Sequence, residues 1–129
     1  MAGPAYFVGG LAIAKNWDWI HAFVLQDNVT APIDLTDVEL RMMIRKHETD
    51  HEALISITSA NADPSYQTSS IVVHSPENGF FTIVIKRKSM GRLFPGHYVS
   101  DLVLTRPDGV QYRLWDASPT EVYDGVTRP

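Results

Sequence analysis

Residues 47–51 have the residue types and spacing of a zinc site, because His47, Glu48 and His51 fit the pattern H-E-x-x-H. On a helix this spacing directs two imidazoles from one face toward a metal ion, while the glutamate activates a bound water. The preceding residues alternate like a strand, however, and the other histidines lie in or beside different expected strands. We therefore interpret the segment as a charged loop. A small zinc hydrolase stays a third hypothesis, after the two given below.

Other sets of catalytic residues are incomplete. The chain has no cysteine for a nucleophile, no G-x-S-x-G elbow and no glycine-rich phosphate loop. Asp34, Asp37 and Asp101 are a conceivable metal cluster, but Asp34 and Asp37 fit the turn that precedes a strand. We expect no catalysis, no metal and no cofactor.

Three tryptophans introduce the hypothesis of a carbohydrate-binding module, because sugars stack on exposed indole rings. They are Trp17, Trp19 and Trp115. Aromatic residues in strands more often belong to the core, where each buries a large apolar area. Trp19 alternates with His21 and Phe23, which predicts that it faces inward, and Trp115 is the candidate for an exposed ring.

The charges are distributed unevenly. The formal net charge of −4 argues against a general nucleic-acid binder, which needs a basic face for the phosphates. Lys86, Arg87 and Lys88, with Arg92 nearby, form a local positive patch that could meet an acidic surface of a partner protein.

No apolar run approaches the roughly 20 residues of a membrane-spanning helix. We expect neither nucleic acid nor a membrane as a partner.

Residues 38–45 give the clearest secondary-structure signal. Apolar residues alternate with mostly charged ones, so period two fits and a helical stripe does not. Similar short segments occupy residues 19–26, 54–58, 71–74, 80–86, 98–105, 110–115 and 121–126. Residues 59–70 read as a loop with room for one short edge strand, and Asn78-Gly79 and Asp108-Gly109 predict tight turns with positive φ angles.

The length of 129 residues fits one domain, since domains commonly have about 100–150. We expect an N-terminal arm over residues 1–10, in which Tyr6, Phe7 and Val8 precede Gly9-Gly10, and a single domain over residues 11–129. The short strands predict an all-β fold, an immunoglobulin-like β-sandwich of seven or eight antiparallel strands.

A corner motif narrows this fold class. Immunoglobulin-like sandwiches have a tyrosine at the start of the penultimate strand, and its hydroxyl bonds back to the backbone a few residues upstream. Here Pro95 and Gly96 supply the corner and Tyr98 the ring, which predicts a tyrosine-corner-like motif.

The order of turns and strand ends resembles that of a known group of proteins. The segments concerned are residues 31–36, the strand 38–45, Asn78-Gly79-Phe80, residues 95–102, Asp108-Gly109 and residues 122–128. Together they resemble small immunoglobulin-like proteins of bacteriophages and prophages, which are associated with tails, baseplates or necks. Two departures are the basic segment 86–92 and the apolar arm over residues 1–8.

The resemblance implies a non-enzymatic structural, partner-binding module, a virion component assembled in the cytoplasm of a bacterial host. Its partners would be other virion proteins or copies of itself, in a homo-oligomer. The candidate interaction residues are Tyr6, Phe7 and Val8 of the arm, and Lys86, Arg87, Lys88 and Arg92 of the basic patch. We expect the arm to pack on a neighbouring copy, at the edge of a sheet.

Overall fold

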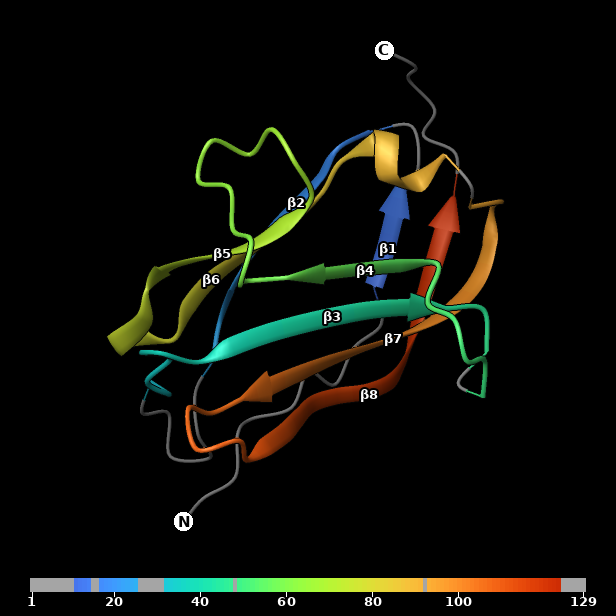
Figure 1. Cartoon of the computed structure of the whole chain (residues 1–129). Coiled ribbons are helices and arrows are strands. Elements are labelled where there is room, and N and C mark those ends of the chain that lie inside the picture. Colours follow the sequence, from blue (N-terminus) through green and yellow to red (C-terminus); the bar gives the residue numbers. More distant parts are fainter. Residues whose placement is uncertain (1–10, 15–16, 26–31, 48, 92, 124–129) are drawn as a thin grey trace.

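The computed structural model describes residues 11–14, 17–25, 32–47, 49–91 and 93–123. These residues contain no α-helix, which confirms the all-β prediction (Figure 1). The eight strands are β1 (Leu11–Ala14), β2 (Trp19–Val24), β3 (Glu39–Arg45), β4 (Ile55–Thr58), β5 (Ser70–Ser75), β6 (Phe80–Ile85), β7 (Gly96–Thr105) and β8 (Gln111–Tyr123). Two short 3-10 turns, η1 (Pro76–Asn78) and η2 (Arg87–Met90), flank β6.

The strands form two sheets with the order of an immunoglobulin-like sandwich. The larger sheet has the order β1-β8-β7-β3-β4, and the smaller one β2-β6-β5. In the lettering of immunoglobulin domains, β2, β6 and β5 take the places of strands B, E and D. Strands β3, β7 and β8 take those of C, F and G, with β4 as C′. The predicted fold class is therefore confirmed, with one correction: β1 pairs with β8 in parallel, because both run toward the same end of the sandwich.

The alternation in residues 38–45 has the predicted structural consequence. Leu40, Met42 and Ile44 are fully buried, whereas Arg41 on the opposite face is exposed. Strand β3 pairs with β4 on one side and β7 on the other, so it lies inside the larger sheet. One buried face and two paired edges explain why the sequence signal is strongest here.

Two segments differ from the prediction. Residues 110–115 and 121–126 were expected to be separate strands, but β8 continues unbroken from Gln111 to Tyr123, and residues 124–126 lie outside the described part. The ten-residue strand β7 pairs with β8 from Gln111 to Val122. Register shifts between Ser100 and Val103 of β7 accommodate the greater length of β8. The short strand β1 was not predicted, and residues 59–69 form a loop without the suggested edge strand.

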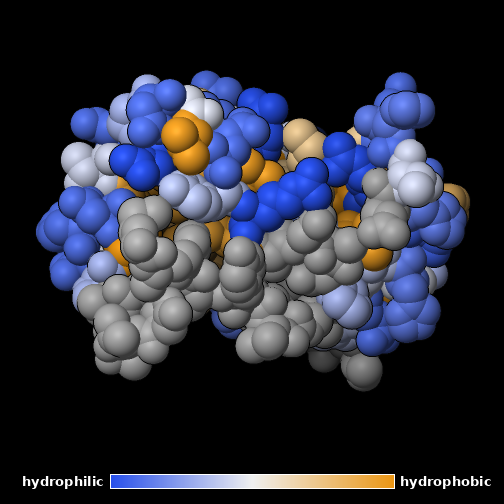
Figure 2. All heavy atoms as spheres, turned by 90° about the horizontal axis from the view of Figure 1, so that it is seen from below, coloured by the Kyte–Doolittle hydropathy of each residue, from blue (hydrophilic) through white to orange (hydrophobic). Residues whose placement is uncertain are grey.

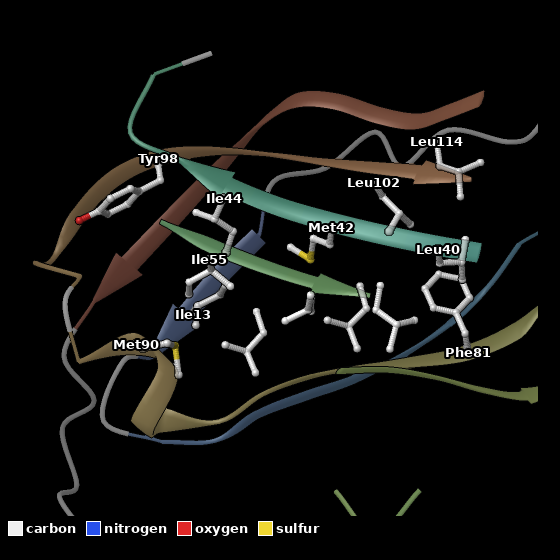
Figure 3. Close-up of a cluster of buried hydrophobic side chains, with 14 of the residues drawn as sticks. Ile13, Leu40, Met42, Ile44, Ile55, Phe81, Met90, Tyr98, Leu102 and Leu114 are labelled. Atoms are coloured by element: carbon white, nitrogen blue, oxygen red, sulfur yellow. The ribbon is translucent and has the colours of Figure 1, made fainter. Parts of the chain in front are cut away.

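The core lies between the two sheets (Figure 3). Its largest members with almost no exposed surface are Phe81, Ile13, Leu35, Leu40, Met42, Ile44, Ile71, Ile83, Ile85, Met90, Leu93 and Leu102. They come from both sheets and from the segments that close the ends. Since the chain has no cysteine, this apolar burial stabilises the fold without a disulfide.

The two predicted turns close hairpins, but each uses one positive φ angle instead of two. Gly79 has φ +67° after η1, and Gly109 has φ +88° after a turn in which its N–H donates to the Arg106 carbonyl. Neither Asn78 nor Asp108 has a positive φ. The loops are therefore longer than two residues, with a left-handed glycine that returns the chain to the ladder.

The tyrosine corner is present at the start of β7. The Tyr98 hydroxyl donates a hydrogen bond of 2.7 Å to the Phe94 carbonyl, and its ring is buried beside the core. The second disulfide cysteine of antibody domains would follow two residues later. Here that position is Ser100, which is buried and accepts a hydrogen bond of 2.8 Å from the Thr120 hydroxyl.

Candidate functional site

Strand β2 presents partly exposed aromatic side chains at the side of the sandwich. Trp19 and Phe23 pack against the core but keep part of their surface in solvent. His21 lies between them and pairs with Ile83, whose side chain is fully buried, so both residues project from the same face of the sheet. His21 is nevertheless exposed. The inward face of β2 is therefore incompletely covered by the described residues.

The rings of this strand contact one another in series, stacked between Trp19 and His21 and tilted by 49° between His21 and Phe23. Trp19 and His21 stack with ring centroids 5.5 Å apart, and His21 and Phe23 follow at 4.7 Å. Phe23 stacks in turn on Phe81 of the core, at 5.4 Å. We call Trp19, His21 and Phe23 the β2 aromatic row. Because each ring contacts the next, the three side chains restrict one another's motion. Together they form an aromatic surface that is partly exposed to solvent.

The outer side of β2 is apolar as well. Ile20 is 47% exposed and Val24 is 53% exposed, with the exposed Ala22 between them. No residue of β2 carries an acidic or basic charge other than the titratable His21. Most solvated strands have a polar outer face, so a strand that is apolar on both faces is a candidate for contact with another chain.

The outer face of the other two strands of the smaller sheet, β5 and β6, is covered by a loop. Residues 59–69 fold over the outer face of β5, where the Asp63 N–H donates to the Ser70 hydroxyl at 3.1 Å. The Tyr66 hydroxyl lies 2.9 Å from His74 Nε2, which is also 2.8 Å from the Thr82 hydroxyl. Val72 and Val84 are buried on this face although they do not belong to the main core. Among the described residues of the smaller sheet, the exposed large apolar side chains, Ile20 and Val24, therefore both lie on β2.

The predicted basic patch is partly neutralised. Lys86 Nζ donates to Asp18 at 2.7 Å, and the Arg87 backbone N–H donates to the same carboxylate at 2.8 Å. The Lys86 hydrogen bond, followed by that of Arg87, lowers the pKa of Asp18. Arg87 and Lys88 are exposed in η2, and Arg92 lies outside the described residues. The sequence did not predict the ion pair between Lys86 and Asp18, because the two residues are 68 positions apart in the chain.

The H-E-x-x-H segment adopts the predicted loop. The Asp50 N–H donates to the His47 carbonyl at 3.1 Å, and the Asp50 carboxylate accepts from the His47 N–H at 3.0 Å. This turn lies between β3 and β4, and the described residues of the segment form no helix that would align His47 with His51. Glu48 lies outside the described residues.

The three aspartates of the conceivable metal cluster have separate roles. The Thr36 hydroxyl and N–H donate to Asp34 at 2.6 and 2.9 Å, and these bonds lower its pKa. Asp37 has φ +60° in the same turn. Asp101 lies 3.8 Å from Arg45 on the outer face of the larger sheet. Within the described residues, no group of three or more acidic residues or histidines could hold a metal ion.

The tryptophans do not form a common surface within the described side chains. Trp19 packs inward as predicted, and Trp17 is 43% exposed just ahead of β2. The side chain of Trp115 and the arm residues Tyr6, Phe7 and Val8 lie outside the described part. Seen from below, the coloured residues of the molecule show small apolar areas between hydrophilic ones (Figure 2). No helix of the described residues is long and apolar enough for a transmembrane span.

Comparisons with known proteins identify no family. No family model matches the chain, and no curated protein matches it. Among solved structures, the chain is similar to the soluble domain of PmoD from Methylocystis sp., at 13% identity and a TM-score of 0.46, over 91% of this chain and 79% of that one. It is also similar to mouse CRIg, at 15% identity and a TM-score of 0.45, over 95% and 98%.

Proposed function

We propose that the protein is a non-enzymatic module that binds other protein chains, copies of itself included, through strand β2. The observation that carries this proposal is the combination of the β2 aromatic row with the exposed Ile20 and Val24 on one uncharged strand. Exposed apolar surface of this kind typically marks a protein contact. Among the described residues, this surface has no cluster of polar groups that would orient a small substrate.

The biological setting is that of a virion. The turn and strand-end residues resemble small immunoglobulin-like phage proteins, and such components act by repeated contact between subunits. In this setting the protein occupies a tail, baseplate or neck, and assembles in the bacterial cytoplasm. The exposed Arg87 and Lys88 add a charged contact that fixes the orientation of a partner with an acidic surface.

Light scattering after size exclusion tests the proposed self-association. The full-length chain is expected to elute as a multiple of 14.4 kDa, and removal of residues 1–8 is expected to lower this mass. Circular dichroism of both proteins serves as the control, because an unchanged strand spectrum shows that the fold survives the deletion. A full-length chain that is monomeric at high concentration would contradict the proposed self-association, whereas an oligomer whose mass the deletion leaves unchanged would reject only the arm as the contact element.

A further inference from the structure

The turn ahead of strand β6 carries exposed negative charge. Glu77 lies in η1, just before β6, and its side chain is exposed. The segment with Asp34 and Asp37 packs on this turn, because the Leu35 N–H donates to the Pro76 carbonyl at 2.7 Å. All three acidic residues are exposed, and none of them forms an ion pair within the described part of the chain. We call Asp34, Asp37 and Glu77 the acidic end.

The turn that follows β6 carries exposed positive charge. Strand β6 stops at Ile85 and leads into η2, where Arg87 and Lys88 are exposed. Their neighbour Lys86 is paired with Asp18 at 2.7 Å. No ion pair among the described residues involves the side chain of Arg87 or Lys88. We call these two residues the basic end.

The two charged ends are too far apart to pair within one copy. The turns η1 and η2 lie at opposite ends of the smaller sheet, because they flank the same strand (Figure 1). Strand β6 has six residues and is therefore about 20 Å long. An ion pair needs charged atoms within about 4 Å of each other, and the Debye length is about 8 Å at physiological ionic strength. The charges of each end are therefore available to another molecule.

We infer that the basic end of one copy contacts the acidic end of a second copy, an inference that rests on the proposed function. The same chain carries both complementary surfaces, and two cations meet three carboxylates in such a contact. Exposed ion pairs add little affinity, but contact between like ends is repulsive, so the pairing selects one orientation. The formal net charge of −4 also disfavours contacts without complementary charge. The copies are thus aligned head to tail, in a contact that repeats from copy to copy.

Chemical crosslinking tests the inference directly, since the chain has no cysteine of its own. One chain carries Asn78→Cys, an exposed position in η1. The other carries Gly91→Cys, an exposed position that directly follows η2, and a tag of different mass. The two chains are mixed, treated with a short bismaleimide and separated on a denaturing gel. The matched control replaces Gly91→Cys with Ser56→Cys, which is exposed on β4 of the other sheet.

Charge reversal shows whether the crosslink depends on the two ends. Arg87→Glu with Lys88→Glu reverses the basic end of the Gly91→Cys chain. Asp34→Asn, Asp37→Asn and Glu77→Lys together reverse the acidic end of the Asn78→Cys chain. Asparagine is used in the turn because its amide oxygen still accepts hydrogen bonds and because it tolerates a positive φ angle.

The two end positions are expected to crosslink about tenfold more than the control pair. Reversal of either end alone lowers the yield to that of the control, and so does about 1 M sodium chloride, where the Debye length is about 3 Å. Mixing the two reversed chains restores the yield, which also shows that both are folded. Equal yields for the end pair and the control, or a yield that survives reversal of one end, would overturn the inference. An oligomer that fails this test leaves the proposed function standing, whereas a monomer in solution removes both.

Discussion

The Tyr98 hydroxyl donates a 2.7 Å hydrogen bond to the carbonyl oxygen of Phe94, four residues earlier. This bond ties the segment that leaves η2 to the start of β7. The Tyr98 ring is only 7% exposed, and Lys46 Nζ lies 4.6 Å from its centre. The Tyr98 ring therefore packs against the core, while its hydroxyl holds the backbone at Phe94.

Tyr98→Phe is expected to lower the free energy of unfolding by about 1 kcal/mol. The ring keeps its packing and its contact with Lys46, so the loss isolates the hydroxyl. The expected loss is that of one ordinary hydrogen bond, whose net contribution is about 0.5–1.5 kcal/mol. Urea unfolding measures it, with Tyr112→Phe as the control because the Tyr112 hydroxyl makes no hydrogen bond to the described residues. Equal effects of the two substitutions would contradict this account.

Gly79→Ala is expected to destabilise the protein much more than Gly109→Ala. Both residues have positive φ angles, which cost a non-glycine residue about 1–2 kcal/mol. At Gly79 an added Cβ would also lie 2.5 Å from the Leu25 carbonyl oxygen and 2.9 Å from that of Ile33. At Gly109 nothing lies within 4 Å. Thermal unfolding of the two variants separates steric overlap from backbone strain, and a smaller loss for Gly79→Ala would refute the packing described here.

The Asp63 carboxylate is expected to make stability depend on acid pH. The Ser65 hydroxyl donates to it at 2.5 Å, and further donors include the N–H groups of Ser65 and Thr68. These bonds lower its pKa from 3.8 to about 2. Since the folded pKa is the lower one, the stabilisation is complete above the unfolded pKa and is lost as pH falls from about 4 to 2. Asp63→Asn should therefore flatten the dependence of unfolding free energy on pH in this window; an unchanged slope would exclude the assignment.

The features of the fold that depend on neighbouring residues in the chain were predictable from the sequence. Alternation in residues 38–45 places Leu40, Met42 and Ile44 inside, and Pro95, Gly96 and Tyr98 form the corner, because these features depend on neighbours in the chain. The short strand β1 has no alternation of its own and is placed by its pairing with β8. Strand β8 likewise continues through Pro119 because it is paired with β7 on both sides of that residue. Proline usually interrupts such a ladder of hydrogen bonds.

The candidate site was predictable only in part. Long-range contacts such as that of Asp18 with Lys86 cannot be read from local patterns. The exposed outer face of β2 did have a local signal, since Ile20, Ala22 and Val24 alternate with aromatic residues and leave no polar face. Absence of a polar face in an edge strand indicates contact with another chain when the fold offers no cover.

The central claim is that β2 is an assembly surface, and the mass in solution of an Ile20→Lys/Val24→Lys variant tests it most directly. A Leu54→Lys/Val110→Lys variant is the matched control, because it adds the same charge at two other exposed apolar residues. By sedimentation equilibrium, the unchanged chain and the control are expected to have the same mass, a multiple of 14.4 kDa, while the β2 variant has 14.4 kDa with an unaltered strand spectrum. Equal masses for all three proteins would contradict the claim.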